Sequence, residues 1–454
     1  MIEALAGERA WLVGGSVRDE LLGRPVVDVD LAVAGDPERA ARALASELRG
    51  PVFRLSEAFG AWRVIDRKAG RTYDFAPLQG DSIESDLAKR DFTVNAMARE
   101  LHGDGELIDP HGGRGDLDSR VLRVVGPRAY EEDPLRPLRL ARLAAELGFA
   151  PEAETERLTR EAAPRVTAAA PERTFAELRR LVIADGAVDG LRLSDRLGLL
   201  GAVLPELGAL HGVEQSQYHH LDVFEHTVAV LERQIELEGR LDEVFGDSAP
   251  PLRELLGEPL ADELTRGQGL RFGALLHDVG KPATRGMRPD GRITFIGHDS
   301  LGEEMVRSLC RRLRTSERFS RFVEGLTRHH LVLGFLVRHA PLDRRVVYHY
   351  LKRTAPVEVE VTLLSCADRM ATRGKNAERA IAAHLELARE LMGEALAWRA
   401  SGPPRLPLRG DELAEGLAIE PGPELGRLLA QLEEAAFAGE VGSRDEALEL
   451  ARRL

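Results

Sequence analysis

Hydrophobic positions repeat with two different spacings along this chain. Over the first 125 residues, short runs of apolar and β-branched residues alternate with turn residues, which is typical of strands. The predicted strands are Ala10–Val13, Val27–Val33, Arg63–Ile65, Arg71–Phe75 and Val121–Val124. Amphipathic spacing predicts a helix over Pro37–Leu48, and from Glu131 onward helical spacing dominates while strand patterns nearly vanish. The pattern predicts an α+β chain, with a small α/β domain followed by an all-α remainder.

Glycine and proline interrupt the helical part at Gly201–Gly212, Gly246–Pro251 and Ser401–Pro407, which we interpret as boundaries or loops. The acidic stretch Glu236–Gly269 is expected to be connecting chain rather than a loop over a site. A length of 454 residues and 43% hydrophobic content are enough for several domains with cores of their own.

Composition narrows the class of protein. No apolar stretch is long enough for a membrane helix and Met1–Ala10 lacks signal-peptide features, so we expect a cytoplasmic protein with no membrane partner. Cys310 and Cys366 are too few and too isolated for disulfides or thiolate metal sites, and we expect both to be buried. The net charge of -13 excludes a globally basic nucleic-acid binder. Arginines clustered in 136–142 and 173–180 nevertheless keep local RNA contact open.

The first candidate site combines a glycine turn with acidic residues. Gly14 and Gly15 join a predicted strand to a helix, which lets backbone N–H groups approach a phosphate. Asp28 and Asp30 alternate on a strand and therefore point to one face. Such a pair suits Mg²⁺ and two-metal nucleotidyl transfer, with a solvated edge pair as the alternative. Asp74 is either a third catalytic carboxylate or a structural turn acid.

Further segments carry a resemblance to a known family. The motif Gly-Gly-Ser-Val-Arg-Asp at 14–19, with the Asp-x-Asp at 28–30, resembles the first motif of class II tRNA nucleotidyltransferases and bacterial poly(A) polymerases. Segments similar to that family's later motifs follow in its order. They are Arg90–Ala96, Asp109–Leu117, Glu132–Arg142 with Leu147–Phe149, and, more loosely because Thr174 replaces an aliphatic residue, Pro171–Leu178.

The resemblance implies template-independent addition of C, and of A as a further option, to the 3′ end of tRNA from CTP and ATP. It also implies a polymerase-beta-type head at 1–125, a helical neck at 126–210 and a helical tail at 401–454. The implied nucleotide-binding residues are Gly14, Gly15, Arg18, Arg90, Asp133, Arg136, Arg139 and Arg142. Three of these arginines recur every three residues and predict a ridge on one helix face that suits a triphosphate. Asp133 and Arg136 are predicted to face a base edge.

One departure from the family pattern concerns specificity. Only the segment 75–80 separates Asp74 from Asp81–Leu87, whereas full CCA-adding members carry a longer flexible loop at this place. The short connection resembles that of CC-adding members, which predicts efficient C addition and poor addition of the terminal A by this chain.

A second candidate site lies in the helical part, at 211–400. The order His226, then His277-Asp278, then Asp368 resembles the HD phosphohydrolase superfamily. Imidazole and carboxylate ligands accept Mn²⁺, Fe²⁺, Ni²⁺ or Mg²⁺, and His298 with His329 or His330 could hold a second ion. The likeness implies phosphodiesterase or phosphatase activity on damaged tRNA ends.

Other functions stay open at this level. A CC-adding enzyme that works with a separate A-adding partner, a poly(A) polymerase and a non-catalytic RNA-binding or nucleotide-sensing protein share parts of these motifs. The acidic C-terminal helices argue against a poly(A) polymerase, for which a basic tail is expected. The intact Asp-x-Asp argues against a non-catalytic protein. A homodimer is an alternative to a monomer.

Overall fold

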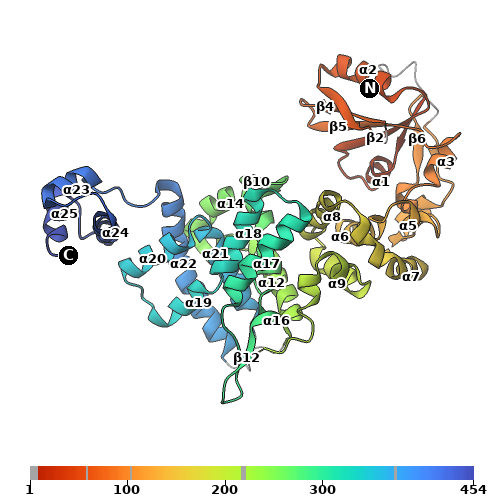
Figure 1. Cartoon of the computed structure of the whole chain (residues 1–454). Helices are drawn as coiled ribbons and strands as arrows, with labels where there is room; N and C mark the ends of the chain where they lie inside the picture. The colour runs from red at the N-terminus through yellow and green to blue at the C-terminus, as the bar shows by residue number, and fades with distance from the viewer. Residues whose placement is uncertain (1–8, 58–59, 103–104, 216–220, 373–375) are drawn as a thin grey trace. The chain divides into compact units, whose positions relative to one another are not determined.

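The computed structural model describes residues 9–57, 60–102, 105–215, 221–372 and 376–454 (Figure 1). Contacts along the chain divide it into two compact units, Met1–Val203 and Leu204–Leu454. The division falls inside the predicted boundary segment 201–212. The α+β prediction is confirmed, since a large sheet forms in the first unit and helices dominate the rest.

The sheet of the first unit has, among the described residues, the strand order β3-β4-β5-β2-β1-β6-β7. Its strands are β1 (Ala10–Val13), β2 (Asp28–Val33), β3 (Val52–Ser56), β4 (Ala61–Asp66), β5 (Arg71–Pro77), β6 (Ala98–Glu100) and β7 (Leu107–Ile108). Strands β2 and β5 pair in parallel and β2 is flanked by β1 on its other side, so β2 is an interior strand. The predicted strands at β1, β2, β4 and β5 are confirmed.

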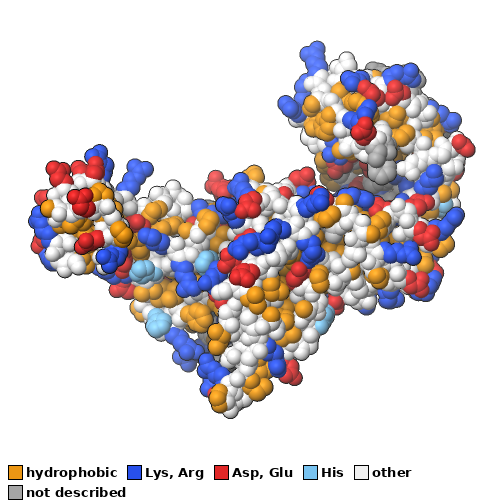
Figure 2. All heavy atoms as spheres, in the orientation of Figure 1, with side chains coloured by type: hydrophobic (Ala, Val, Ile, Leu, Met, Phe, Trp, Pro, Cys, Tyr) orange, Lys and Arg blue, Asp and Glu red, His pale blue; other side chains and the backbone are white. Residues whose placement is uncertain are grey.

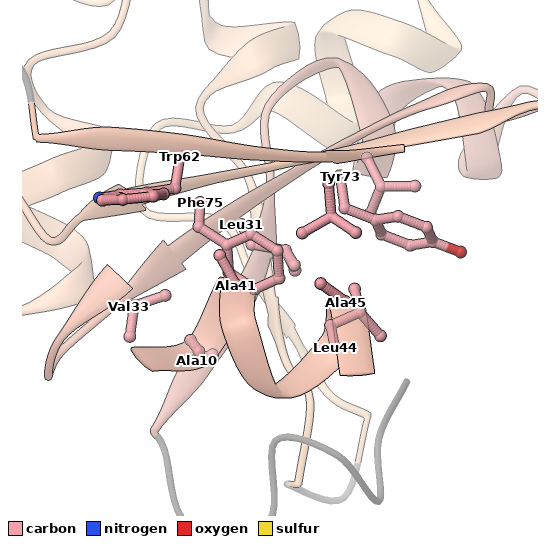
Figure 3. Close-up of a cluster of buried hydrophobic side chains, with 12 residues drawn as sticks. Ala10, Leu31, Val33, Ala41, Leu44, Ala45, Trp62, Tyr73 and Phe75 are labelled. Atoms are coloured by element: carbon pink, nitrogen blue, oxygen red, sulfur yellow. The ribbon is translucent and has the colours of Figure 1, made fainter. Parts of the chain in front are cut away.

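Helix α2 (Pro37–Leu48) packs its apolar face on this sheet, and its predicted bounds are confirmed. The Asp36 carboxylate caps it by accepting from the Glu38 backbone N–H at 2.9 Å. Leu44 is fully buried in a cluster that includes Leu31 and Phe75 of the sheet (Figure 3). Because one face of β2 is buried by this cluster, the acidic residues that alternate with the apolar ones are left on the opposite face.

The remainder of the first unit is mostly helical. Its helices are α1 (Gly15–Leu21), α3 (Ile83–Leu87), α4 (Gly113–Asp118), α5 (Ala129–Glu132), α6 (Arg136–Leu147), α7 (Ala153–Ala162), α8 (Pro171–Ile183), α9 (Ala187–Arg196) and α10 (Leu199–Val203). The strand predicted at Val121–Val124 is shorter and belongs elsewhere: β8 (Val121–Leu122) pairs with β9 (Ala150–Pro151), not with the large sheet. A strand so short is held by a neighbour that is distant in sequence, which local pattern does not reveal.

Where the structure describes it, the second unit consists of helices with two short hairpins. Its helices are α11 (Pro205–Gly208), α12 (Val223–Glu238), α13 (Leu241–Phe245), α14 (Ala249–Gly257), α15 (Arg266–Leu276), α16 (Lys281–Thr284), α17 (His298–Leu313), α18 (Glu317–His329), α19 (Val332–Leu336), α20 (Arg344–Thr354), α21 (Glu358–Ala371), α22 (Ala377–Ser401), α23 (Gly410–Leu417), α24 (Pro423–Ala438) and α25 (Arg444–Ala451). The hairpins are β10 (Pro259–Ala261) with β11 (Leu264–Thr265), and β12 (Arg285–Met287) with β13 (Ile293–Phe295). Apart from these hairpins and the two-residue strand β9, the described regular elements after Glu131 are helices, as predicted.

The stretch 236–269 is ordered, since it contains α13, α14 and the first hairpin. Cys310 in α17 and Cys366 in α21 are free and buried, as predicted. Among the described helices, none combines the length and the apolar character that crossing a membrane requires.

Candidate active sites

Asp28 and Asp30 lie on the interior strand β2, so the edge-pair alternative is wrong. In the parallel register of β2 and β5, Asp30 is opposite Asp74 and Asp28 is opposite Thr72. Thr72 donates a hydrogen bond from Oγ1 to Asp28 Oδ1 at 2.5 Å. All three carboxylates line one cavity of about 560 Å³. The structure thus brings the predicted catalytic acids to one place.

Asp74 lies within a strand rather than in a turn, and it already has a partner. Arg63 of β4, whose role the sequence did not suggest, donates from Nε to Asp74 Oδ1 at 2.7 Å and from Nη2 to Oδ2 at 2.6 Å. Bidentate pairing fixes the carboxylate in one orientation. Asp74 would therefore enter a metal site as a positioned carboxylate whose charge is partly matched by Arg63.

The charges around Asp30 test whether a cation fits. Burial is the main cause that raises the pKa of Asp30 to about 6; Arg90 lowers this pKa, and Asp74 and Asp28 raise it. Neighbouring carboxylates are ionised together at low cost only when a cation neutralises them. Hard oxygen donors on one face are the ligands that Mg²⁺ accepts. The donor set at Asp28 and Asp30 therefore fits a divalent ion.

The glycine turn leaves room beside these acids. Gly14 has φ +69 and ψ -135, which side-chain-bearing residues rarely adopt. A Cβ at this position would lie 2.6 Å from Arg90 Nη1 and 3.5 Å from Asp30 Oδ2. Gly15 begins α1, and Ser16 Oγ donates to the Asp28 carbonyl and accepts from the Asp30 N–H. The turn is thus tied to β2 at the two acids.

Arg18 and Arg90 line the cavity, as predicted, and each is held by neighbouring oxygens. Arg18 donates from Nε and Nη2 to Asp19 at 2.9 and 2.8 Å and from Nη1 to Asn95 Oδ1 at 2.6 Å. Arg90 donates from Nε and Nη2 to Asp86 Oδ2 at 3.1 and 3.0 Å. These contacts restrain both guanidinium groups at the wall of the cavity.

Arg136 and Asp133 are engaged differently from the sequence expectation. Arg136 donates to the backbone carbonyls of Lys89 and Ala129 at 2.5 and 2.8 Å. The Asp133 carboxylate accepts from Arg173 Nη2 at 2.6 Å and does not lie among the described residues that line the cavity. Both side chains would have to release these partners before meeting a base edge.

Arg139 and Arg142 of α6 line the cavity and are held by carboxylates. Arg139 donates to Asp91 at 2.9 Å and to Glu177 at 3.2 Å. Arg142 donates to Glu177 at 2.5 Å and to Glu146 at 2.6 Å. Burial raises the pKa of Asp91, but the charge of Arg139 and the hydrogen bonds outweigh it and lower the pKa to about 2. The predicted ridge is therefore a fixed network rather than a solvated helix face.

Positive and negative side chains balance among the described residues that line this cavity. The cations are Arg18, Lys89, Arg90, Arg136, Arg139, Arg142 and Arg180, and the carboxylates are Asp19, Asp28, Asp30, Asp74, Asp86, Asp91 and Glu177. An incoming triphosphate would therefore need added cations. The sequence motifs contained Asp86, Asp91 and Glu177 without suggesting a role for them. The available signal was their position beside motif arginines: Asp91 directly follows Arg90, and Asp86 and Glu177 each lie four residues from an arginine.

The second site gathers side chains from five segments of the second unit. Asp278 lies at its centre: its Oδ2 is 3.1 Å from His277 Nε2 and 3.8 Å from His226 Nε2. Its Oδ1 is 3.3 Å from His298 Nε2 and 3.7 Å from His330 Nε2. The ligand atoms of each of two groups, His226-His277-Asp278 and Asp278-His298-His330, lie within 4.8 Å of one another. The predicted ligands thus form two groups that share Asp278.

Asp368 of α21 borders this cluster, with Oδ1 3.0 Å from His226 Nε2. Of the two histidines that the sequence left open, His330 joins the cluster and His329 does not. Lys281, which the sequence did not single out, lies with Nζ 2.6 Å from Asp278 Oδ2.

The imidazole rings are oriented for metal binding. The Nδ1 atoms of His277, His298 and His330 lie 2.9, 2.6 and 2.7 Å from the carbonyl oxygens of residues 274, 295 and 327. A carbonyl only accepts, so each Nδ1 carries a proton, and in the neutral form of each ring Nε2 presents a lone pair. His298 Nε2 and His330 Nε2 are 3.3 Å apart, and buried His277 Nε2 makes no hydrogen bond. Facing lone pairs repel, so this donor set fits divalent cations.

Comparisons with known proteins match different family profiles to the two parts of the chain that contain these sites. The profile of the poly A polymerase head domain matches residues 10–123, that of a probable RNA and SrmB-binding site of polymerase A matches 148–210, and that of the HD domain matches 223–373. The chain is 38% identical over 451 residues to the A-adding tRNA nucleotidyltransferase of Deinococcus radiodurans, covering 98% of this chain and 95% of that protein. It is 37% identical over 444 residues to the CC-adding tRNA nucleotidyltransferase of Thermus thermophilus, covering 96% and 92%. It is 35% identical over 449 residues to the multifunctional CCA protein of Xanthomonas campestris, covering 95% and 98%.

Solved structures share the fold. A CCA-adding enzyme with ATP superposes with a TM-score of 0.66 at 20% identity, covering 100% of this chain and 93% of that one. The Thermotoga maritima CCA-adding enzyme complexed with tRNA-CCA gives 0.62 at 20% identity, covering 100% and 92%.

Proposed function

The chain belongs to the tRNA nucleotidyltransferase family, and from this premise we propose that it adds C residues to the 3′ end of tRNA from CTP and adds the terminal A poorly. The supporting observation is the connection from β5 to α3, which is short and tied down. Leu78 N–H donates to the Val33 carbonyl at 2.9 Å, and Gln79 N–H donates to Asp86 Oδ1 at 3.0 Å. A segment held in this way has little conformational freedom. It is therefore poorly suited to rearranging the site from the incorporation of C to the incorporation of A.

Identity to relatives does not decide between C and A, because an A-adding and a CC-adding relative are almost equally similar. The A-adding and the CC-adding relative both act on tRNA by name, which favours tRNA over a homopolymer end as the acceptor. We therefore place this chain with CTP and tRNA in the cytoplasm, working beside a separate A-adding enzyme. Its oligomeric state, monomer or homodimer, can be measured by light scattering.

In the proposed mechanism, Asp28 and Asp30 would hold Mg²⁺, and Asp74 lies beside them as a third carboxylate. When bound there, Mg²⁺ would lower the pKa of the attacking 3′ hydroxyl and stabilise the departing pyrophosphate. Gly14 keeps the approach to the acids open because any side chain would meet Arg90. The triphosphate and the base would be oriented by the other predicted nucleotide contacts, which are Gly15, Arg18, Arg90, Arg136, Arg139 and Arg142. Asp133 would contribute to base recognition only after it releases Arg173.

The test is a primer-extension series. Transcripts of one tRNA that lack the last three, two or one 3′ nucleotides are incubated with Mg²⁺ and with CTP, ATP or both, and products are sequenced. We expect two C residues on the shortest primer and little A on the primer ending in CC. Efficient completion to CCA would overturn the specificity, ATP homopolymers would favour a poly(A) polymerase, and unchanged incorporation by the Asp28→Ala/Asp30→Ala variant would overturn the site.

We further propose that the histidine and aspartate cluster is a metal-dependent phosphohydrolase site. The oriented Nε2 lone pairs around Asp278 support it, and the mixed donors accept Mn²⁺, Ni²⁺ or Mg²⁺. His226, His277, Asp278 and Asp368 would hold one ion, and His298 with His330 a second. A bound ion would activate water toward a phosphoester. Hydrolysis of 2′,3′-cyclic AMP is measured with each metal; equal turnover by wild type and the His277→Ala variant would remove this function.

A further inference from the structure

The histidine and aspartate cluster is bordered by two cavities, and only one of them holds the cluster's carboxylates. The first cavity, of about 600 Å³, is lined by Asp278, His298, His330 and Asp368. The second, of about 500 Å³, is formed by hairpin β12-β13, the start of α17 and helix α19. Lys281, His298 and Leu331 line both cavities, so the two meet beside the cluster. Each volume lies in the range of about 300 to 1,000 Å³ that small-ligand pockets occupy.

From this arrangement we propose that the site acts on an RNA 3′ end at least two nucleotides long. The terminal phosphate would occupy the first cavity, and the preceding nucleotide the second. The inference rests on the proposed phosphohydrolase function and names its substrate class. Its reaction is balanced with water alone: water adds to phosphorus of a 2′,3′-cyclic phosphate, one P–O bond to ribose breaks, and that oxygen takes a proton from the water.

The charges of the second cavity suit a phosphodiester. Among the described residues that line it, Lys281, Arg288, Arg328 and Arg353 are cationic, and Asp299 is the carboxylate. Asp299 is already the partner of Arg328. Lys281 is likewise paired with Asp278. The positive surplus therefore comes from Arg288 and Arg353, which are both exposed. A cationic surplus beside a reacting phosphate attracts the next phosphate of an RNA backbone.

Exposed apolar side chains lie in the same cavity. Phe335 of α19 is 69% exposed and Ile296 is 79% exposed, so neither contributes much to a core. Figure 2 shows hydrophobic and basic side chains side by side at the end of the molecule where Figure 1 places hairpin β12. An aromatic ring next to arginines is the combination on which a nucleobase stacks while its phosphate is held. A mononucleotide bound at the cluster would leave this combination unused.

The test compares two substrates that share the same reacting end. Values of kcat/KM are measured for 2′,3′-cyclic AMP and for cytidylyl-adenosine 2′,3′-cyclic phosphate, with Mn²⁺ or Ni²⁺. We expect the dinucleotide to be favoured about tenfold or more, because stacking of one base contributes roughly that factor. Phe335→Ala and Arg353→Gln should each lower the dinucleotide-to-mononucleotide ratio. The matched control is Phe53→Ala, an exposed phenylalanine of the first unit, which should leave the ratio unchanged.

Each outcome separates the two proposals. If wild type hydrolyses both substrates with a ratio near one, the second cavity is not a nucleotide site while the phosphohydrolase function stands. A high ratio that Phe335→Ala and Arg353→Gln leave intact would likewise overturn the cavity assignment. If neither substrate is turned over with any metal, the phosphohydrolase function itself fails, and the inference falls with it. A calorimetric Tm of the second unit that matches wild type shows that the Phe335→Ala and Arg353→Gln variants are folded.

Discussion

Neutralising Asp91 should weaken the first unit by an amount that depends on pH. Asp91 is 5% exposed and accepts hydrogen bonds from Arg139 and Asn95. Its pKa is about 2 instead of 3.8: burial raises it, and Arg139 with the hydrogen bonds lowers it by more. At about 1.4 kcal/mol per pKa unit, the ionised carboxylate stabilises the fold by about 2 kcal/mol. Arg139 is a less direct measure of this pair, because Glu177 also raises its pKa.

The sign follows from the lowered pKa. Stability from Asp91 is fully present above the unfolded-state pKa near 4 and is lost as pH falls toward 2. Asp91→Asn should therefore cost about 2 kcal/mol at pH 7, and about half of that difference should remain at pH 3. Neither wild type nor variant should differ in this contribution between pH 6 and pH 8.

Urea unfolding measures this difference. Trp11 and Trp62 of the head sheet report on the first unit, so both proteins are compared in a Trp398→Phe background that removes the tryptophan of the second unit. The control is Asp118→Asn, whose partner Arg114 is also exposed, and a cost below about 0.5 kcal/mol is expected for it. A cost for Asp91→Asn that matches this control, or that stays constant from pH 7 to pH 3, would refute the reasoning.

Three further perturbations have defined outcomes. Gly14→Ala should lower kcat/KM for CTP at least about tenfold, because the new Cβ meets Arg90. Gly70→Ala, at a glycine with a similar positive φ but open space around it, should leave kcat/KM unchanged, and equal effects of the two substitutions would contradict this account. Leu44→Ala should destabilise the first unit by about 2 to 5 kcal/mol in urea unfolding, and a loss below about 1 kcal/mol would mean that the cluster of Figure 3 repacks freely. Ni²⁺ at a hundredfold excess over its Kd should stabilise the second unit by about 3 kcal/mol and raise its calorimetric Tm. An equal rise of Tm in the Asp278→Asn variant would contradict metal binding at Asp278.

Local pattern was sufficient for some elements and not for others. Helix 37–48 was predictable because its cap, its N-terminal proline and its apolar face all lie within its own sequence. Strand β6 was missed because its sequence, Ala-Arg-Glu, carries no strand pattern, and its pairing with β1 and β7 joins residues that are distant in sequence or separated by a turn. The hairpin β12-β13 was missed for a different reason: Asp290-Gly291 and Ile293–Phe295 carry turn and strand signals, but each strand has only three residues and lies among long helical segments.

The candidate sites show the same limit. Alternation on one strand was enough to place Asp28 and Asp30 on one face, because that relation is local. The sequence could not show that Arg63 pairs with Asp74, since the register between β4 and β5 brings them together. It also could not show that Asp133 faces Arg173, because this contact depends on how distant helices of the first unit pack.

The tether between each ring nitrogen and the carbonyl three residues earlier has a practical consequence. Because both partners belong to one short stretch of backbone, the direction of each imidazole is set by that local backbone rather than by neighbouring elements. A substitution that shifts one of these helices would carry its donor atom along as a rigid piece. Substitutions in the remote packing of these elements would therefore change the spacing between the donor atoms in small steps. Such changes would alter which ion the cluster prefers while every ligand stays in place.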